Sequence, residues 1–340
     1  MLERFPGLYE ITLEERPESR NVIQLYLVKG SSGQRNLLVD SGYGTQWSLD
    51  HLLAELDALH IPVDTLDVIL THKHADHCGL AHALQERGAT LFMNREDDRH
   101  QYDCLYYRLD HSNEKAQQRV LTRTGITPET APLIWQKFMD FNDRLSDNHP
   151  VWMMTIDEFD YQDLTSGMVF AYGDYHFEAI HLRGHTYGQM GLVDKGKKLL
   201  LCADQILNRT APIVGTSHAD EHLLKYYLES ILDMEKTYED YTILPAHEGP
   251  IADLHASVAH TMQAYQRKID QTLACVLPNK EQTVWQITKQ VYGLTPNDRS
   301  DAAFYNSKMT NSKTFSMLEY LYDIGAIHRR EENGMLFYQR

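Results

Sequence analysis

Short apolar segments separated by turn residues make up the first part of the chain. Residues 21–28 and 36–39 are rich in β-forming side chains, and the glycine- and serine-containing segment 30–33 lies between them, so this pattern predicts a β-hairpin. Leucines recur at helical spacing over 48–59 and predict an amphipathic helix. The apolar run over 63–70 is typical of a buried strand.

The same alternation of strand and helix patterns continues along the chain. Helices are predicted over 79–87 and 221–238. Strand patterns occur at 90–93, 168–172, 175–181, 189–193, 198–202 and 241–244. Strands that alternate with helices indicate an α/β layered fold.

Two stretches differ from this alternation. Residues 95–163 are polar and aromatic and are predicted to be mostly helical, which makes them a candidate insertion. Residues 251–340 contain three amphipathic helix patterns, followed by a hairpin turn signal at 332–334. These helices are predicted over 257–276, 283–292 and 313–325. The order suggests a small winged-helix-like module, so we divide the chain into a domain over 1–250 and a C-terminal module over 251–340.

Composition and charge narrow the class of protein. Hydrophobic residues make up 42% of the 340 positions and charged residues 24%, as expected for a folded globular chain. The net charge is −16, which argues against a surface for nucleic-acid phosphates or anionic membranes. The C-terminal module differs in charge from the rest of the chain. It contains 10 Lys/Arg and 9 Asp/Glu residues, which give it a net charge of +1.

Targeting and cysteine patterns indicate a cytoplasmic location. The N-terminal residues resemble no signal peptide, and no apolar run approaches the ~18 residues of a membrane span. Cys78, Cys104, Cys202 and Cys275 are scattered and form no CxxC motif. We therefore expect a protein of a reducing compartment without disulfides.

The segment LTHKHADHCG, residues 70–79, concentrates groups that a hydrophobic core disfavours. Side chains two residues apart in an extended segment point the same way, so His72 and His74 can share one metal ion. Asp76 and His77 lie beyond the turn and can face a second ion. Imidazole binds zinc, copper, iron and nickel, and carboxylates suit harder ions. The alternative is a solvated loop that is rich in histidine without binding metal.

Three further motifs place polar residues directly after predicted strands. They are RGHTYG with His185, LCADQ with Asp204, and LPAHEGP with His247. Sites in layered α/β folds gather at the carboxyl ends of strands. Each residue has another explanation by itself, as a loop histidine, a helix cap or a packed side chain. Their joint occurrence in this order favours a single site.

Together with Asp40 in the run LLVDSG, these motifs resemble the metallo-β-lactamase superfamily over roughly residues 20–250. The resemblance implies an α/β fold, the four-layer αβ/βα sandwich, with 95–163 as a helical cap near the site mouth. It implies one metal ion held by His72, His74 and His185 and a second held by Asp76, His77 and His247. Asp204 would bridge the two ions. Asp40 would orient the histidine loop, as carboxylates behind metal ligands do.

The resemblance also implies two divalent metal ions, zinc first, with iron or manganese as alternatives. Asp76 and His247 are the candidate catalytic residues. Tyr43, Trp47 and Tyr187 adjoin the motifs and are candidate walls of a substrate pocket. Three positions depart from the family pattern: Ala203 where glycine is usual, Tyr187 where proline is frequent, and Gln189 where histidine or serine is frequent.

These observations favour a hydrolase that uses a metal-bound hydroxide on a small ester, thioester or lactone. A phosphodiesterase or ribonuclease of the same fold is the first alternative, although the C-terminal module lacks the basic stripe of a nucleic-acid face. The second alternative is a mononuclear-iron enzyme related to the sulfur dioxygenases. We expect a small-molecule substrate and neither membrane nor nucleic acid as partner. The C-terminal module would pack within the chain or form a homodimer.

Overall fold

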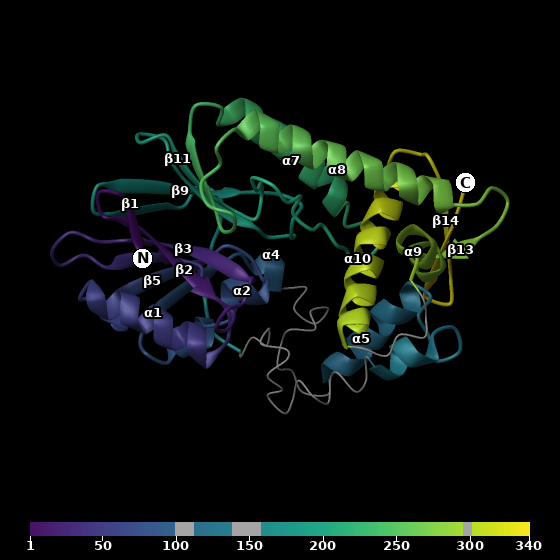
Figure 1. Ribbon diagram of the computed structural model, residues 1–340, viewed down its shortest axis with the longest axis horizontal. Coiled ribbons are helices and arrows are strands. Elements are labelled where there is room, and N and C mark those ends of the chain that lie inside the picture. The colour runs from purple at the N-terminus through teal and green to yellow at the C-terminus, as the bar shows by residue number, and fades with distance from the viewer. Residues whose placement is uncertain (99–111, 138–157, 295–300) are drawn as a thin grey trace.

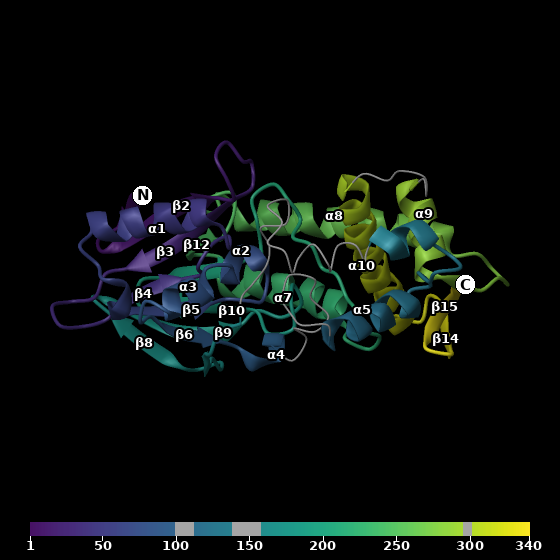
Figure 2. The same ribbon diagram turned by 90° about the horizontal axis from the view of Figure 1, so that it is seen from below.

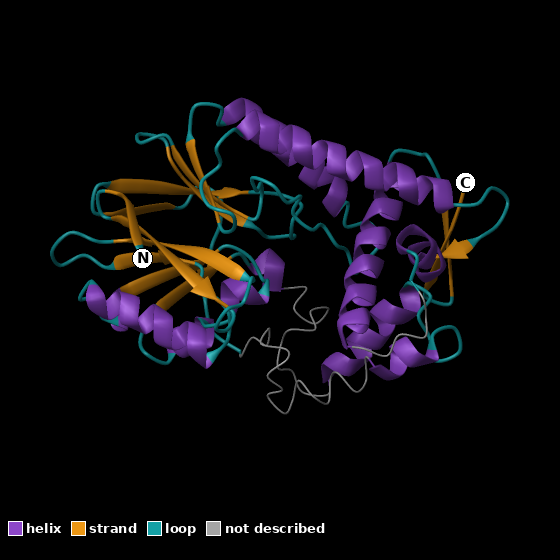
Figure 3. Ribbon diagram, in the orientation of Figure 1, coloured by secondary structure: helices purple, strands orange, loops and turns teal. Residues whose placement is uncertain are grey.

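The computed structural model describes residues 1–98, 112–137, 158–294 and 301–340 of the chain. Two β-sheets face each other in one lobe, and a mainly helical lobe lies beside them (Figure 1). Colouring by secondary structure separates the strand-rich lobe from the helical one (Figure 3). The metallo-β-lactamase-type sandwich expected from the sequence is therefore confirmed, together with a C-terminal region.

The first sheet contains seven strands in chain order. Its first three pairings are antiparallel and the remaining three are parallel. The strands are β1 (Leu2–Phe5), β2 (Leu8–Glu14), β3 (Val22–Val28), β4 (Asn36–Val39), β5 (Leu66–Leu70), β6 (Thr90–Met93) and β7 (Gln162–Asp163).

The second sheet contains five strands in the order β12-β11-β10-β9-β8. Only the β11–β12 pairing is parallel. The strands are β8 (Val169–Tyr172), β9 (Tyr175–His181), β10 (Met190–Asp194), β11 (Leu199–Ala203) and β12 (Thr242–Pro245). Parallel neighbours end at the same edge, so β11 and β12 deliver their following loops to one place.

Alternation along each strand builds separate cores on the two faces of a sheet. On β3, Leu25 and Leu27 belong to one hydrophobic cluster with leucines of α1 (Gln46–Ala58) and apolar residues of α3 (Ala81–Gln85). Tyr26 and Val28 point the other way and pack between the two sheets. The Tyr26 hydroxyl also donates a hydrogen bond to the Pro245 carbonyl across the sandwich, at 2.6 Å. A register shift of one residue would exchange these faces, so burial fixes the pairing.

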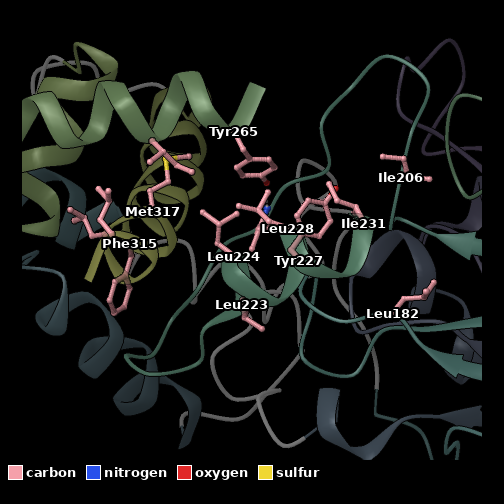
Figure 4. Packing of buried hydrophobic residues seen from close by; sticks show 14 of the residues in the cluster. Leu182, Ile206, Leu223, Leu224, Tyr227, Leu228, Ile231, Tyr265, Phe315 and Met317 are labelled. Carbon is pink, nitrogen blue, oxygen red and sulfur yellow. Dashed lines mark hydrogen bonds between the residues drawn. The ribbon is translucent and has the colours of Figure 1, made fainter. Parts of the chain in front are cut away.

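A third hydrophobic cluster covers the outer face of the second sheet and extends into the C-terminal region. Side chains of β10 and β11 pack against α7 (Leu223–Thr237), which contributes Leu224, Tyr227 and Ile231. Tyr265 and Phe315 belong to the same cluster (Figure 4). One continuous core therefore joins the sandwich to the C-terminal helices.

The C-terminal region follows the predicted order of helices and a final hairpin. It comprises α8 (Leu254–Cys275), β13 (Gln282–Thr283), α9 (Val284–Tyr292), α10 (Asp301–Asp323), β14 (His328–Glu332) and β15 (Met335–Gln339). The strands form a small sheet in the order β13-β15-β14. Thr283 and Gln286 form a reciprocal capping box that begins α9.

Some element boundaries differ from the sequence-based prediction. The pair β1–β2 was not predicted, because charged residues and an exposed edge obscure its alternation. Residues 63–65 form a 3₁₀ turn rather than the start of the strand. Helix α10 starts twelve residues before the predicted 313, in a polar stretch without apolar periodicity.

The predicted cap over 95–163 is described only in part. Residues 99–111 and 138–157, with most of its aromatic side chains, lie outside the described residues. The rest includes α4 (Arg95–Asp98), α5 (Ser112–Arg123) and a helical turn at 132–137. Thr124, just after α5, bonds to the Trp285 amide and the Asn311 side chain. From below, α5 lies beside α10 (Figure 2), so this part of the stretch packs on the C-terminal region.

Two expectations from composition can be compared with the structure. No helix in the described ranges is long and apolar enough to cross a membrane. Cys78, Cys202 and Cys275 are free thiols, and Cys104 lies outside the described residues. The compartment itself stays a prediction.

We predict that Gly79→Ala destabilises the protein, because a Cβ at Gly79 would lie 2.2 Å from the Gly44 amide nitrogen and 2.6 Å from the Gly42 carbonyl oxygen. Backbone atoms cannot move aside as a side-chain end can. We expect a loss of about 3 kcal/mol in the free energy of unfolding, measured by urea denaturation. Gly196→Ala is the control, since its nearest neighbour would be 3.4 Å away. Equal stability of the two variants would contradict the close approach.

Candidate metal centre

The loop that carries His72, His74, Asp76 and His77, called the histidine loop here, directly follows β5. Hydrogen bonds to Ser41 hold it in place. Its last turn is the short helix α2 (Ala75–Cys78). The His77 carbonyl accepts hydrogen bonds from the Ser41 amide at 2.7 Å and the Ser41 hydroxyl at 2.8 Å. The Ser41 hydroxyl in turn accepts from the Leu80 amide. These bonds fix the loop against the end of β4, the parallel neighbour of β5.

His72, His74 and His185 bring three imidazole nitrogens together. His72 Nε2 lies 2.9 Å from His74 Nδ1 and 3.2 Å from His185 Nε2, and His74 Nδ1 lies 3.0 Å from His185 Nε2. Nitrogen ligands about 2.1 Å from a tetrahedral ion lie about 3.4 Å apart. The trio therefore fits one metal ion, and it consists of the three histidines that the resemblance assigns to the first ion.

Asp76, His77 and His247 form the second group. Asp76 Oδ2 lies 3.4 Å from His247 Nε2 and 3.8 Å from His77 Nε2. His77 Nε2 is buried and has no hydrogen-bond partner among the described residues. A buried nitrogen without a partner costs free energy, and a metal ion would satisfy it.

Asp204 lies between the two groups. Its Oδ2 is 3.6 Å from His185 Nε2, and its Oδ1 is 3.6 Å from His77 Nε2 and 3.5 Å from His247 Nε2. Oδ1 is also a buried oxygen without a hydrogen-bond partner in the described chain. One carboxylate thus faces both groups, and the residues present fit a pair of metal ions.

Hydrogen bonds behind the ligands select the nitrogen that each ring presents. His77 Nδ1 donates to Asp40 Oδ2 at 2.8 Å, and His247 Nδ1 donates to the Val22 carbonyl at 2.7 Å. Both rings therefore direct Nε2 into the site. Asp40 also accepts from the amide and the hydroxyl of Thr71, which starts the loop. Asp40 therefore lies behind the histidines and contacts both His77 and the first residue of the loop.

The two groups differ in their electrostatics. Burial holds the pKa of His72 well below its usual range and lowers the pKa of His74 to about 3. Burial also disfavours the charged form of His247, but the Asp204 and Asp76 carboxylates outweigh it and raise this pKa to about 9. The pKa values of Asp204 and Asp76 fall, since the His247 and His77 imidazoles outweigh their burial. Metal binds neutral imidazoles and ionised carboxylates, so His74 is in the binding form at neutral pH, whereas His247 has to release a proton when a metal ion binds.

A buried carboxylate that the sequence analysis missed, Asp97 in α4, connects the two histidine motifs. It accepts hydrogen bonds from the Lys73 amide at 2.9 Å, the Thr186 hydroxyl at 2.8 Å and the Gly188 amide at 2.5 Å. Asp97 lies just after β6, so the rule that site residues follow strands could have pointed to this segment. The sequence alone could not have selected Asp97, because nothing in the run Arg95–Asp98 distinguishes it from its acidic neighbours.

Two departures from the family pattern have structural counterparts. Ala203 has a φ of 49°, in the left-handed region that favours glycine. Alanine in this conformation costs roughly 1 kcal/mol. Gln189 accepts from the Asp204 amide at 3.3 Å and donates to the Gln205 side chain at 2.7 Å. It therefore supports the bridging carboxylate from behind.

A cavity of about 810 Å³ opens over the two groups. His74, Asp76, His185, Asp204 and His247 line it. Of the three candidate wall residues, Tyr43 lines this cavity. Trp47 is exposed on α1, Tyr187 packs against the third hydrophobic cluster, and neither is among the lining residues.

The apolar segment 211–213 also lines the cavity, and helices of the C-terminal region hold this segment in place. The Tyr265 hydroxyl of α8 donates to the Pro212 carbonyl at 2.6 Å and accepts from the Val214 amide at 3.0 Å. Ser312 of α10 bonds to the Thr216 carbonyl. The C-terminal region therefore shapes the cavity, although it contributes no residue to the two groups of histidines and aspartates that could bind metal.

The sequence matches the model of the metallo-beta-lactamase superfamily over residues 21–247. The chain belongs to this superfamily. The matched segment contains every histidine and aspartate of the two groups. A search of the curated proteins finds no match.

Two solved structures of the superfamily type resemble the chain over nearly its whole length. One is a metallo-beta-lactamase family protein from Thermus thermophilus, with 22% identity, a TM-score of 0.75 and 99% of each chain covered. The other is a beta-lactamase domain protein from Burkholderia ambifaria, with 21% identity, a TM-score of 0.75, and 100% of this chain and 94% of that chain covered. At such identities the likeness shows the fold alone.

We predict that Asp97→Asn lowers metal affinity by about 10- to 100-fold, because an amide cannot accept all three hydrogen bonds that join the histidine motifs. Competition with a chromogenic chelator measures the affinity. Asp98→Asn is the control on the same helix, since the Asp98 carboxylate accepts from Tyr161 instead. Unchanged affinity in Asp97→Asn would show that the carboxylate does not position the ligands.

Proposed function

We propose that this protein is a binuclear metal-dependent hydrolase acting on a small ester, thioester or lactone. The proposal depends chiefly on the two adjoining groups of His and Asp with the Asp204 carboxylate directed at both. We propose zinc as the metal, with iron or manganese as alternatives, because all three accept this ligand set. When bound, two such ions supply Lewis acidity and activate water at neutral pH.

The protein side chains would bind, orient and transfer protons. His72, His74 and His185 would hold one ion, and Asp76, His77 and His247 the other. Asp40 would keep His77 in the required tautomer. We assign proton transfer to Asp76, whose carboxylate lines the cavity, with His247 Nε2 beside its Oδ2 at 3.4 Å. The water proton would pass to Asp76 and then to the leaving group.

The cavity supports a small carbonyl substrate. Its wall includes Leu207, Ala211, Pro212 and Ile213, and Met309 of α10 also lines it. An apolar wall beside a polar floor suits an acyl group whose carbonyl meets the site. A volume of about 810 Å³ accommodates a small molecule.

A phosphodiesterase or ribonuclease of the same fold is the second candidate. The order helix, strand, helix, helix and hairpin over 254–339 supports a winged-helix-like module, which is how we interpret residues 251–340. Helix pairs of this kind can bind nucleic acid. The near-zero net charge of the module ranks this candidate second. A mononuclear-iron enzyme ranks third, because the second group would have no role.

Replacing both His72 and His74 with alanine is expected to remove bound metal and to reduce hydrolysis by at least about 1,000-fold. Elemental analysis of protein purified without chelator gives the metal content. Rates are measured with a 4-nitrophenyl ester, an acyl thioester, a γ-lactone and bis-4-nitrophenyl phosphate. His328→Ala, at an exposed position on β14, is the control.

Two metal ions per chain with carbonyl-ester turnover would support the proposal. Turnover of the phosphodiester or of RNA alone would favour the second candidate. One iron ion per chain without ester hydrolysis, or full activity of the double variant without metal, would contradict the proposal.

A further inference from the structure

One strand wall of the cavity carries polar groups that the protein itself does not use. Val22 and Gln24 lie two residues apart on β3, and both line the cavity together with Arg20 and Asn21 from the loop before this strand. The Val22 carbonyl binds His247, and the Gln24 amide nitrogen of the backbone donates to the Ala246 carbonyl at 2.7 Å. Val22 and Gln24 therefore lie beside the segment that carries His247, and Arg20 lies two residues before Val22.

The side chain of Gln24 is placed to contact a bound molecule. Gln24 is only 7% exposed, and its Oε1 is buried without a hydrogen-bond partner in the part of the chain that the structure describes. An amide group left unpaired in this way costs free energy. Gln24 also lines the cavity, and its Oε1 can pair only with a molecule that carries an N–H or O–H donor.

Two guanidinium groups lie at the outer part of the same cavity. Arg20 is exposed and makes no side-chain hydrogen bond or ion pair within the described residues. The side chain of Arg209, on the loop after β11, is 81% exposed and approaches Glu248 no closer than 3.9 Å. Both therefore retain free donors for a ligand.

The carboxylates of this region are occupied by local hydrogen bonds. Glu15 accepts from the Asn21 side chain at 2.8 Å and the Ser19 hydroxyl at 3.1 Å. Glu248 accepts from the Arg209 amide at 2.6 Å and the Thr210 hydroxyl at 2.5 Å. Glu15 is thus tied to its own loop and Glu248 to the loop after β11, while both guanidinium groups extend without a close partner.

We propose that Arg20 and Arg209 form an anion subsite, and that the substrate is an acyl ester or thioester carrying a carboxylate or a phosphate group. This inference rests on the proposed hydrolase function and names its substrate class. A guanidinium group binds both anions through paired N–H donors. Arg20 lies four residues before Gln24, so their backbones are at most about 14 Å apart, and the charge lies on the order of 10 Å from the end of the molecule at Gln24.

The test compares substrates that differ only in this charge. The first set consists of 4-nitrophenyl monoesters of linear dicarboxylic acids with four to ten carbons, and the second of the same compounds as methyl esters. Monoesters with a terminal phosphate form the third set. We expect kcat/KM of the wild-type protein to be at least 10-fold higher for one anionic set than for the neutral set, mainly through KM. The favoured set identifies the anion.

The double variant Arg20→Ala/Arg209→Ala should reduce this preference to about one without changing kcat/KM for the methyl esters. Arg16→Ala is the matched control, because Arg16 is exposed on the same loop but does not line the cavity. It should keep the full preference. Higher salt should weaken the preference, since the guanidinium groups are exposed.

The possible outcomes separate this inference from the function on which it rests. Equal turnover of charged and neutral esters, or a preference that survives in the double variant, would overturn the anion subsite and leave the hydrolase intact. If no ester is hydrolysed, the ester reaction fails, and equilibrium binding of the same compounds to the zinc-loaded protein then tests the subsite. Equal affinity for the charged and neutral compounds would overturn it.

Discussion

The hydrogen bonds of the buried Asp40 carboxylate hold the histidine loop in place, and the geometry of the site depends on them. A buried carboxylate is costly unless it is paired, and Asp40 is paired with the Thr71 amide and hydroxyl and with His77. These partners are close because β4 and β5 are parallel neighbours that end at the same edge. Asp40 itself has a φ of 65°, so the chain adopts an unfavourable backbone conformation there to make these contacts. The pairing of β4 with β5 therefore helps to orient His77, one of the residues that would hold a metal ion.

The second sheet supplies the ligands that the histidine loop lacks. His185 lies between β9 and β10, Asp204 follows β11, and His247 follows β12. The distance of these residues from the histidine loop depends on how the two sheets pack. The hydrogen bond from the Tyr26 hydroxyl to the Pro245 carbonyl joins the sheets two residues before His247. Because protein interiors are close-packed, a change between the sheets would displace one group of ligands relative to the other. Fold stability and ligand geometry therefore share the same contacts.

Much of this arrangement could be predicted from the sequence, because the relevant signals are local. Strand β6 over 90–93 was predicted at its exact boundaries, and the ligand motifs each follow a strand as expected. Asp97 was missed because its role depends on contacts with Lys73 and Gly188, which only the folded chain brings near it. Trp47 adjoins a motif in sequence but points to solvent on α1, since neighbours along a helix face different directions. Proximity along the chain therefore identified ligands better than it identified the walls of the cavity.

The attachment of segment 211–216 to Tyr265 and Ser312 has a consequence for how this protein can diverge. The metal-binding residues and the residues that position the apolar wall belong to different parts of the chain and are under separate constraints. Substitutions in α8 or α10 can reshape the wall while every ligand keeps its place. The range of molecules admitted can therefore change through positions that a comparison of metal-binding motifs would not detect.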